Sequence, residues 1–278
     1  MRAAADGEML TFACGSIQSH SRNAVPSNPM KSTALKFLLA GCAAALLAPA
    51  ALHAAPRVDP QALASLKRMS DTLAAAKAFT YQSQTISEVP AKNGQFLTVF
   101  STWDVALKRP DKLRAHLAGG APHFDFYYDG ATAAAFAPGT KVFSSSKAPG
   151  TIDAMLPALE HETGIRLAPA GLLFSDPYKA LTSDVTSGLY VGRDEVNGIP
   201  CDHLAFRGRG VNWEIWIESG PRALPLRLAV TYADRPNFPR VLVEFSRWNL
   251  HPGLKPGNFA FCPPAGSREI PFRSLLKR

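Results

Sequence analysis

The sequence predicts an α+β fold whose main layer is an antiparallel sheet. Short segments that alternate apolar and polar residues follow one another between turns rich in Pro and Gly, which is typical of an antiparallel meander. Two Asn-Gly dipeptides, Asn93-Gly94 and Asn197-Gly198, separate such segments and predict tight hairpins. Helical periodicity is confined to the start of the domain and to residues 151–181. We therefore expect two runs of strands with one helical insertion between them.

The first element is an amphipathic helix over about 60–77. Asp59 is a favourable N-cap, and Pro60 suits the first helical position because its missing N–H is not needed there. The apolar side chains recur at helical spacing on one face, which we expect to pack on the core: Leu63, Leu66, Leu73 and Ala76.

The first run of strands begins with a long hairpin. Strands are expected over 80–89 and 95–107 around the Asn93-Gly94 turn, and four shorter strands over 112–117, 123–128, 131–136 and 141–145.

The helical insertion follows the first run. Thr151 can cap a helix that ends at Thr163, and Pro157 is expected to kink or divide it. A short piece over 169–174 and a third helix after Asp176-Pro177 complete the insertion.

The second run of strands has the clearer alternation. It is expected over 189–196, 199–206, 213–218, 224–232 and 241–246, and each strand has one apolar face and one mainly polar face. Residues 259–264 can add a last short edge segment, which Pro263 ends.

Residues 30–54 have the organisation of an export signal. Lys31 and Lys36 form a basic region, 37–52 carry no charge, and small residues close the segment at Ala54-Ala55. We expect residues 1–29 to be a misassigned start or a disordered extension, 30–54 a signal peptide, and 55–278 a single domain that works in the periplasm.

Two other interpretations of this segment are a membrane anchor and a lipid anchor. The apolar run is about 16 residues long and contains Pro49, whereas a membrane-spanning helix needs about 20, so no transmembrane segment is expected after signal removal. Leu39-Ala40-Gly41-Cys42 resembles a lipobox and would place a lipid on Cys42. The ten apolar residues after Cys42 disfavour that lipoprotein alternative.

The charge distribution argues against a nucleic-acid partner. The chain has 30 Lys and Arg against 22 Asp and Glu, a net charge of +8. The basic residues lie mostly in turns, such as 108–112, 207–209 and 234–236, rather than in a stripe with interleaved aromatic residues. We interpret them as solvated loop charges, and the alternative is a weak attraction to an anionic membrane surface or an acidic partner.

Catalytic, metal and cofactor motifs are not found in the sequence. Cys201 with His203, or His161 with Glu162, are the pairs from which a hydrolase could be built, and we take their structural interpretation instead. No metal or cofactor site is predicted. Cys201 and Cys262 lie after the signal, and they form either one disulfide or two free thiols.

Aromatic and branched residues on the strand faces are the main candidate for a binding function. They either fill the hollow of a curved sheet or surround an apolar ligand. Alternation places eleven of them on one face, away from Glu214, Arg227 and Glu244, as the candidate lining: Leu97, Val99, Trp103, Phe124, Phe126, Trp213, Ile215, Leu226, Leu228, Val243 and Phe245.

The hairpin over 216–228 resembles that of the periplasmic lipoprotein carriers, the LolA/LolB-like superfamily. Its residues are Trp216-Ile217-Glu218-Ser219-Gly220-Pro221, followed by Leu224-Pro225-Leu226-Arg227-Leu228. With segments 197–206, 245–248 and 261–266, the chain resembles a family of predicted periplasmic proteins of unknown function within that superfamily, over about 59–273. The resemblance implies a strongly curved, unclosed antiparallel half-barrel with helices over its concave face and a hydrophobic cavity between them.

Three functions follow from these patterns and the resemblance. The first is a non-enzymatic periplasmic carrier or sensor of an apolar ligand, such as a lipid or acyl chain. The second is an envelope protein that binds other proteins or has a structural role and a filled core. The third is the hydrolase described above.

Overall fold

The computed structural model describes residues 58–119, 123–163 and 169–271. The predicted signal peptide, its cleavage site and Cys42 lie outside the described residues.

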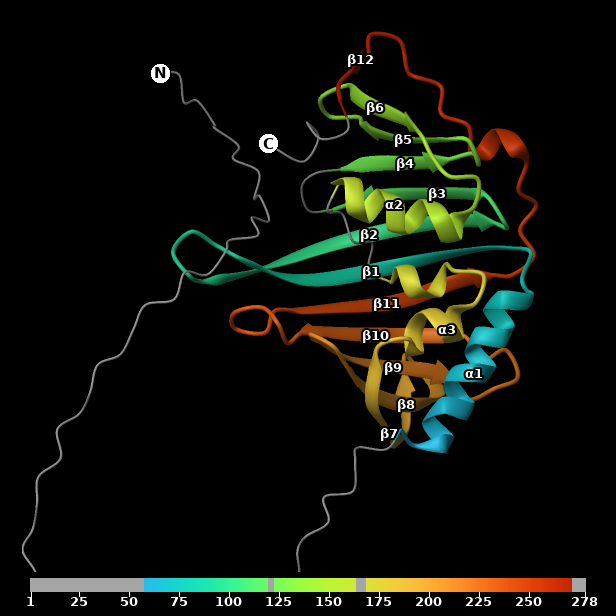
Figure 1. Cartoon of the computed structure of the whole chain (residues 1–278), viewed down its shortest axis with the longest axis vertical. Helices are drawn as coiled ribbons and strands as arrows, with labels where there is room; N and C mark the ends of the chain where they lie inside the picture. The colour runs from blue at the N-terminus through green and yellow to red at the C-terminus, as the bar shows by residue number, and fades with distance from the viewer. Residues whose placement is uncertain (1–57, 120–122, 164–168, 272–278) are drawn as a thin grey trace, which may run out of the picture. The chain divides into compact units, whose positions relative to one another are not determined.

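Twelve strands form a single sheet within the described residues, in the order β12-β6-β5-β4-β3-β2-β1-β11-β10-β9-β8-β7 (Figure 1). Neighbouring strands are antiparallel except β12 and β6. The strands are β1 Ala78–Pro90, β2 Phe96–Lys108, β3 Lys112–Ala118, β4 Phe124–Tyr128, β5 Thr132–Ala137, β6 Val142–Lys147, β7 Val185–Val196, β8 Ile199–Gly208, β9 Val211–Glu218, β10 Pro225–Tyr232, β11 Arg240–Asn249 and β12 Arg268–Glu269.

The two predicted hairpins are confirmed, with different turns. Asn197 and Gly198 both have positive φ, 51° and 78°, as a two-residue hairpin turn requires. The turn between β1 and β2 is longer, because Ala91 donates its N–H to the carbonyl of Gln95 at 2.7 Å and only Gly94 has positive φ.

The two runs of strands meet at β1 and β11. These strands pair antiparallel, with Thr85 opposite Val243. The first strand of one run therefore lies beside the last strand of the other, and the sheet is continuous but not closed, as expected for an open half-barrel.

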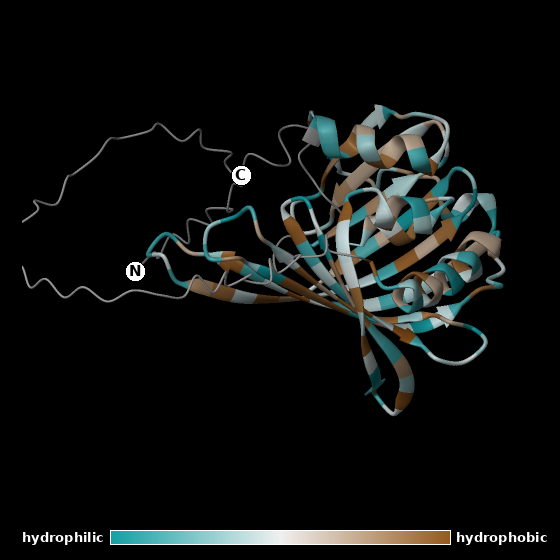
Figure 2. Ribbon diagram, turned by 60° about the horizontal axis from the view of Figure 1, so that its bottom comes forward, coloured by the Kyte–Doolittle hydropathy of each residue, from teal (hydrophilic) through white to brown (hydrophobic). Residues whose placement is uncertain are grey.

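Helices α1 Pro60–Ala75, α2 Ile152–Thr163 and α3 Pro177–Thr182 and the 3₁₀ turn η1 Ala170–Leu172 gather on one side of the sheet (Figures 1 and 2). Asp59 caps α1 by accepting the N–H of Gln61 at 2.7 Å, and Asp176 caps α3 in the same manner. The predicted division of the second helix at Pro157 is wrong, since α2 continues through it.

The C-terminal segment differs from the prediction. Residues 259–264 form no strand, and the edge is instead β12, which pairs with β6. Pro263 and Pro264 have no N–H to donate, so pairing begins only beyond them. A further 3₁₀ turn, η2 Pro256–Asn258, precedes Phe261, whose ring packs on three strand residues: Tyr127, Phe136 and Phe143.

Candidate functional site: the helix-covered face of the sheet

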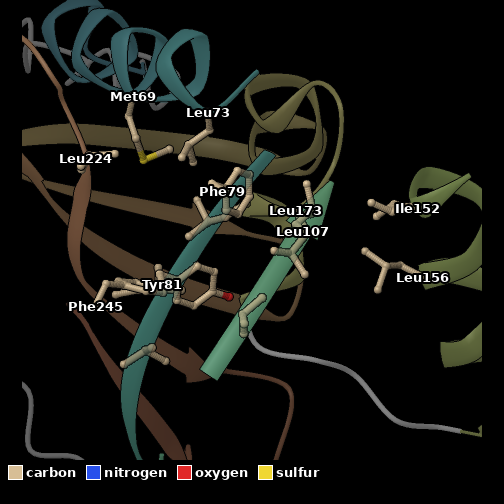
Figure 3. Close-up of a cluster of buried hydrophobic side chains, with 14 of the residues drawn as sticks. Met69, Leu73, Phe79, Tyr81, Leu107, Ile152, Leu156, Leu173, Leu224 and Phe245 are labelled. Atoms are coloured by element: carbon tan, nitrogen blue, oxygen red, sulfur yellow. The ribbon is translucent and has the colours of Figure 1, made fainter. Parts of the chain in front are cut away.

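The concave face and its helices enclose one large hydrophobic cluster. Figure 3 shows Met69 and Leu73 of α1 beside Phe79 of β1, and Ile152 and Leu156 of α2 facing Leu107 of β2. All these side chains are buried. Their removal from water is the main stabilising contribution to this part of the fold.

Aromatic rings fill the part of this face near α1. Tyr81 lies 4.6 Å from Trp248 and 5.6 Å from Phe245 between ring centroids. Phe206 and Trp213 are stacked at 4.3 Å. Burial raises the pKa of Tyr81, because the ionised phenolate would lose its hydration. This half of the face is densely packed.

Nine of the eleven candidate lining residues are partly or fully buried and keep the predicted strand parity. Phe126, Trp213, Ile215, Leu228, Val243 and Phe245 belong to the large buried cluster. Trp103 and Phe124 are partly buried and pack against this cluster. Their two rings meet edge to face, with centroids 5.6 Å apart. Val99 is half-buried.

Of the other two residues, Leu97 keeps the predicted face but is not buried, and the predicted facing of Leu226 is wrong. Leu97 is 45% exposed because it lies near the tip of the β1–β2 hairpin, beyond the helices. Leu226 belongs to a second buried cluster with Cys201 and Trp216, on the opposite face of the sheet. The cause is a register shift between Pro225 and Arg227, which interrupts the alternation on which the prediction depended.

An apolar strip runs along the concave side of β2, and its side chains become more exposed toward the β1–β2 turn. Leu107 is 0% exposed and Val105 7%, both under the helices. Trp103 and Val99 are half-buried, and Leu97 is exposed. An apolar surface therefore continues from solvent into the core, interrupted only by Ser101.

We call the helices on the concave face, α1, α2, α3 and η1, the helical cover. Arg109 joins this cover to the end of β2. Its Nη1 donates to the carbonyl of Leu173, just after η1, at 3.1 Å, and its Nη2 donates to the carbonyl of Leu73 in α1 at 3.3 Å. The guanidinium also lies over the ring of Phe79, 5.8 Å from its centroid. One side chain thus connects three separate parts of the chain.

The third nitrogen of Arg109, Nε, is buried without a hydrogen-bond partner among the described residues. Burial lowers the pKa of this arginine, and the charge of Asp153 partly opposes that effect. An incompletely satisfied buried cation is costly, so this connection is weaker than a fully bonded one.

Sequence reasoning missed Arg109. It treated 108–112 as solvated turn charges, and the only local signal was an arginine directly after a predicted strand that ends in apolar residues. The carbonyls that it binds come from segments 36 and 64 residues away.

Asp202 fixes the other end of the cover. This buried carboxylate accepts hydrogen bonds from Ser65 at 3.0 Å and Arg68 at 2.9 Å, both in α1, and from Tyr190 in β7 at 2.9 Å. Helix α1 is therefore held by a polar network at the β7–β8 edge of the sheet, whereas Arg109 holds its other end.

The predicted reactive pairs do not form a catalytic site. Burial, with smaller contributions from Asp194 and Asp202, raises the pKa of the Cys201 thiol to about 11. His203 instead contacts Glu214 through Nε2 at 3.0 Å and stacks on Trp216. His161 and Glu162 are exposed on α2.

Both cysteines of the described residues are free, Cys201 buried and Cys262 exposed. The disulfide alternative is therefore not realised in the structure. Over the same residues, no group of three or more His, Cys, Asp or Glu is arranged to hold a metal ion.

A family model described as "Predicted periplasmic protein (DUF2092)" matches residues 62–273, more than half of the chain. The chain belongs to this family. It is therefore a periplasmic protein, and its twelve-stranded sheet is an open antiparallel half-barrel. In the parts that the structure describes, each helix is too short or too polar to cross a membrane.

Some solved structures are similar to this chain at low sequence identity. An uncharacterized conserved protein from Thermus thermophilus is 10% identical, with a TM-score of 0.46 over 76% of this chain and 99% of that one. The LolA superfamily protein NE2245 from Nitrosomonas europaea is 11% identical, with a TM-score of 0.37 over 72% and 97%. The lipoprotein LppX from Mycobacterium tuberculosis is 14% identical, with a TM-score of 0.35 over 69% and 96%. No curated protein matches the chain.

Proposed function

We propose that this protein is a non-enzymatic periplasmic carrier or sensor that takes up an apolar chain, such as an acyl chain of a lipid, between the concave face and its helices. Residues 30–54 would direct export and be removed, which leaves 55–278 as the working domain.

The observation that carries the proposal is the way in which Arg109 closes the cover. A purely structural contact at this position would be served better by an apolar side chain, because burying a guanidinium with one unpaired N–H costs free energy. A polar contact of moderate strength suits a cover that must open. When Arg109 releases Leu173, the segment that contains η1 loses this hydrogen bond to the end of β2.

The strip on β2 provides the route of entry. An apolar ligand that meets Val99 and Trp103 can slide toward Val105 and Leu107 without crossing a charged group. Its apolar surface would leave water gradually, at about 25 cal/mol per Å² buried. The space itself would form as the cover lifts, since the closed core is packed.

The test is titration of residues 55–278, stripped of lipid, with a fluorescent fatty acid. We expect saturable binding of one molecule per chain. Trp103→Gln should weaken it, because a polar amide then stands on the entry strip. The matched control is Phe100→Gln, which changes an aromatic residue on the opposite face of the same strand, 63% exposed, and should bind like the wild type.

A second candidate function is supported by the packing near α1. The rings of Tyr81, Phe245 and Trp248 and the Phe206–Trp213 stack fill that part of the face. Such a core suits an envelope protein whose surface, rather than its interior, binds partners. Absence of saturable fatty-acid binding by the wild type would favour this function over the carrier.

A further inference from the structure

A groove of about 360 Å³ lies on the face of the sheet opposite the helices. It crosses β1, β2 and β3 and reaches β11. Its residues alternate with buried ones such as Tyr81, Leu107 and Leu113, so they point away from the hydrophobic cluster. The groove is separate from the space assigned above to an apolar chain.

Two arginines stand at opposite ends of this groove. Arg114 is on β3, and Arg247 is on β11, three strand positions away, so their backbones are about 14 Å apart. Between them lie Thr80 and Ala106, which are cross-strand partners with small side chains. The floor is therefore low where the two guanidinium groups can approach each other.

A β-bulge directs Arg247 into the groove. Thr80 pairs with Asn249 and Gln82 with Ser246, so two residues of β11, Arg247 and Trp248, stand opposite one residue of β1. Trp248 turns into the core, and Arg247 turns to the other face. Arg247 has a φ of 54°, a conformation that costs a non-glycine residue energy.

Arg247 has no ion-pair or hydrogen-bond partner among the described residues, and it is exposed. Arg114 lies over the ring of Tyr127, 5.3 Å from its centroid, which holds its guanidinium in place while most of its N–H donors stay available. Strained backbone that presents an unpaired cation is typical of a binding site rather than of a stabilising contact.

The remaining polar groups define what a ligand must offer beside its anionic group. Asp104 accepts one hydrogen bond from Gln82 at 2.9 Å and retains acceptor capacity for a hydroxyl. His116 uses Nδ1 on Asp125 at 2.6 Å, which leaves Nε2 for the groove. The site thus combines two guanidinium groups, which can bind an anion, with the carboxylate of Asp104, which can accept a hydrogen bond.

We propose that this groove binds a phosphate ester that carries a neighbouring hydroxyl group. The phosphate would lie between Arg114 and Arg247, because its tetrahedral oxygens can meet two guanidinium groups that arrive from opposite directions. The hydroxyl would donate to Asp104. The same chemistry occurs in a free glycerol phosphate and in the head group of a phosphatidylglycerol membrane.

The test measures binding of glycerol 3-phosphate by calorimetry, and of phosphatidylglycerol–phosphatidylcholine vesicles by flotation, with residues 55–278. The deciding variant is Arg247→Gly. Glycine tolerates the positive φ, so this variant should be no less stable than the wild type while its binding falls at least tenfold. Arg114→Ala, and Ala106→Leu, whose larger side chain fills the floor of the groove, should also reduce binding at least tenfold. The control is Arg209→Ala, which removes an exposed charge in the β8–β9 turn.

Binding of glycerol 3-phosphate would support a free ester as ligand, and binding to vesicles alone would support a head group. The proposal fails if the wild type binds neither probe. It also fails if Arg209→Ala weakens binding as much as Arg247→Gly does, since the attraction would then be diffuse charge. Equal affinity for citrate would overturn the assignment to phosphate.

Discussion

The guanidinium of Arg109 and the carbonyl oxygen of Leu173 are joined by a hydrogen bond of 3.1 Å that connects the end of β2 to the segment after η1. Because a second bond reaches Leu73 in α1, a single residue fixes two parts of the helical cover. The proposed opening of that cover therefore depends on one side chain whose removal can be tested.

Arg109→Ala should loosen the cover. Hydrogen bonds from a charged donor contribute more than neutral ones, but relief of the buried cation offsets part of the loss, so we expect the free energy of unfolding to fall by about 1–3 kcal/mol. Amide hydrogen exchange over 170–182 should accelerate, and fatty-acid uptake should become faster. Arg207→Ala, an exposed arginine on β8, is the control. Unchanged exchange over 170–182 would mean that Arg109 does not hold the cover.

Trp213→Ala should destabilise the protein by about 3–5 kcal/mol, the loss expected for a fully packed aromatic side chain. Trp213 is buried and stacked on Phe206. Urea denaturation measures the loss, and Phe100→Ala, at an exposed position, should stay within about 0.5 kcal/mol of the wild type. A loss below about 1 kcal/mol for Trp213→Ala would show that the core has room at this position.

Asp202→Ala should free the N-terminal half of α1. Four donors, Ser65, Arg68, Tyr190 and Ser219, lose their shared acceptor, and two of them belong to the helix. We expect a loss of about 2–4 kcal/mol in urea denaturation, and about 1 kcal/mol for Tyr190→Phe, which removes one bond only. Equal losses for the two variants would argue that the network does not act through Asp202.

Cys201 should react slowly with thiol reagents in the folded protein. Its pKa is raised to about 11 by burial, so at pH 7–8 the nucleophilic thiolate is scarce and inaccessible. Cys262 is exposed and should react at once. Labelling of residues 55–278 without reductant should therefore give one fast thiol in the native state and two after denaturation. Absence of any free thiol after denaturation would demonstrate the disulfide instead.

The raised pKa of Cys201 should also make the protein less stable above pH 9. The unfolded thiol ionises near its ordinary pKa of 9.0, whereas the native thiol keeps its proton to about pH 11. The native state then binds more protons than the unfolded state, so the free energy of unfolding should decrease as pH rises through this window. Cys201→Ala should remove this part of the decrease, measured by urea denaturation at pH 8 to 10.5. An unaltered pH profile in the variant would exclude Cys201 as its source.

Local patterns predicted the elements and most of the facing of the strands. Asn197-Gly198 identified a hairpin because few residues tolerate two consecutive positive φ angles. The opposite facing of Trp213 and Glu214 followed from period-two alternation, and burial of Trp213 agrees with it.

Register shifts and long-range contacts were not predictable in this way. Leu226 and Arg247 both lie at bulges, where one extra residue reverses the alternation and nothing in the neighbouring residues signals it. Arg109 is typical of a turn residue in its local sequence, and its role depends on the carbonyls of Leu73 and Leu173, which are distant in the chain. The sheet could thus be predicted from the sequence, whereas the contacts that close the helical cover could not.

Native mass spectrometry of the protein purified from its own cell envelope, followed by lipid extraction, tests the central claim most directly. The account predicts a complex of one chain with one acyl-bearing molecule, which is released when the protein is denatured and rebinds residues 55–278 after they have been stripped of lipid. Recovery of the ligand-free mass alone, together with no saturable uptake of a fluorescent fatty acid, would contradict the carrier and leave the filled-core envelope protein.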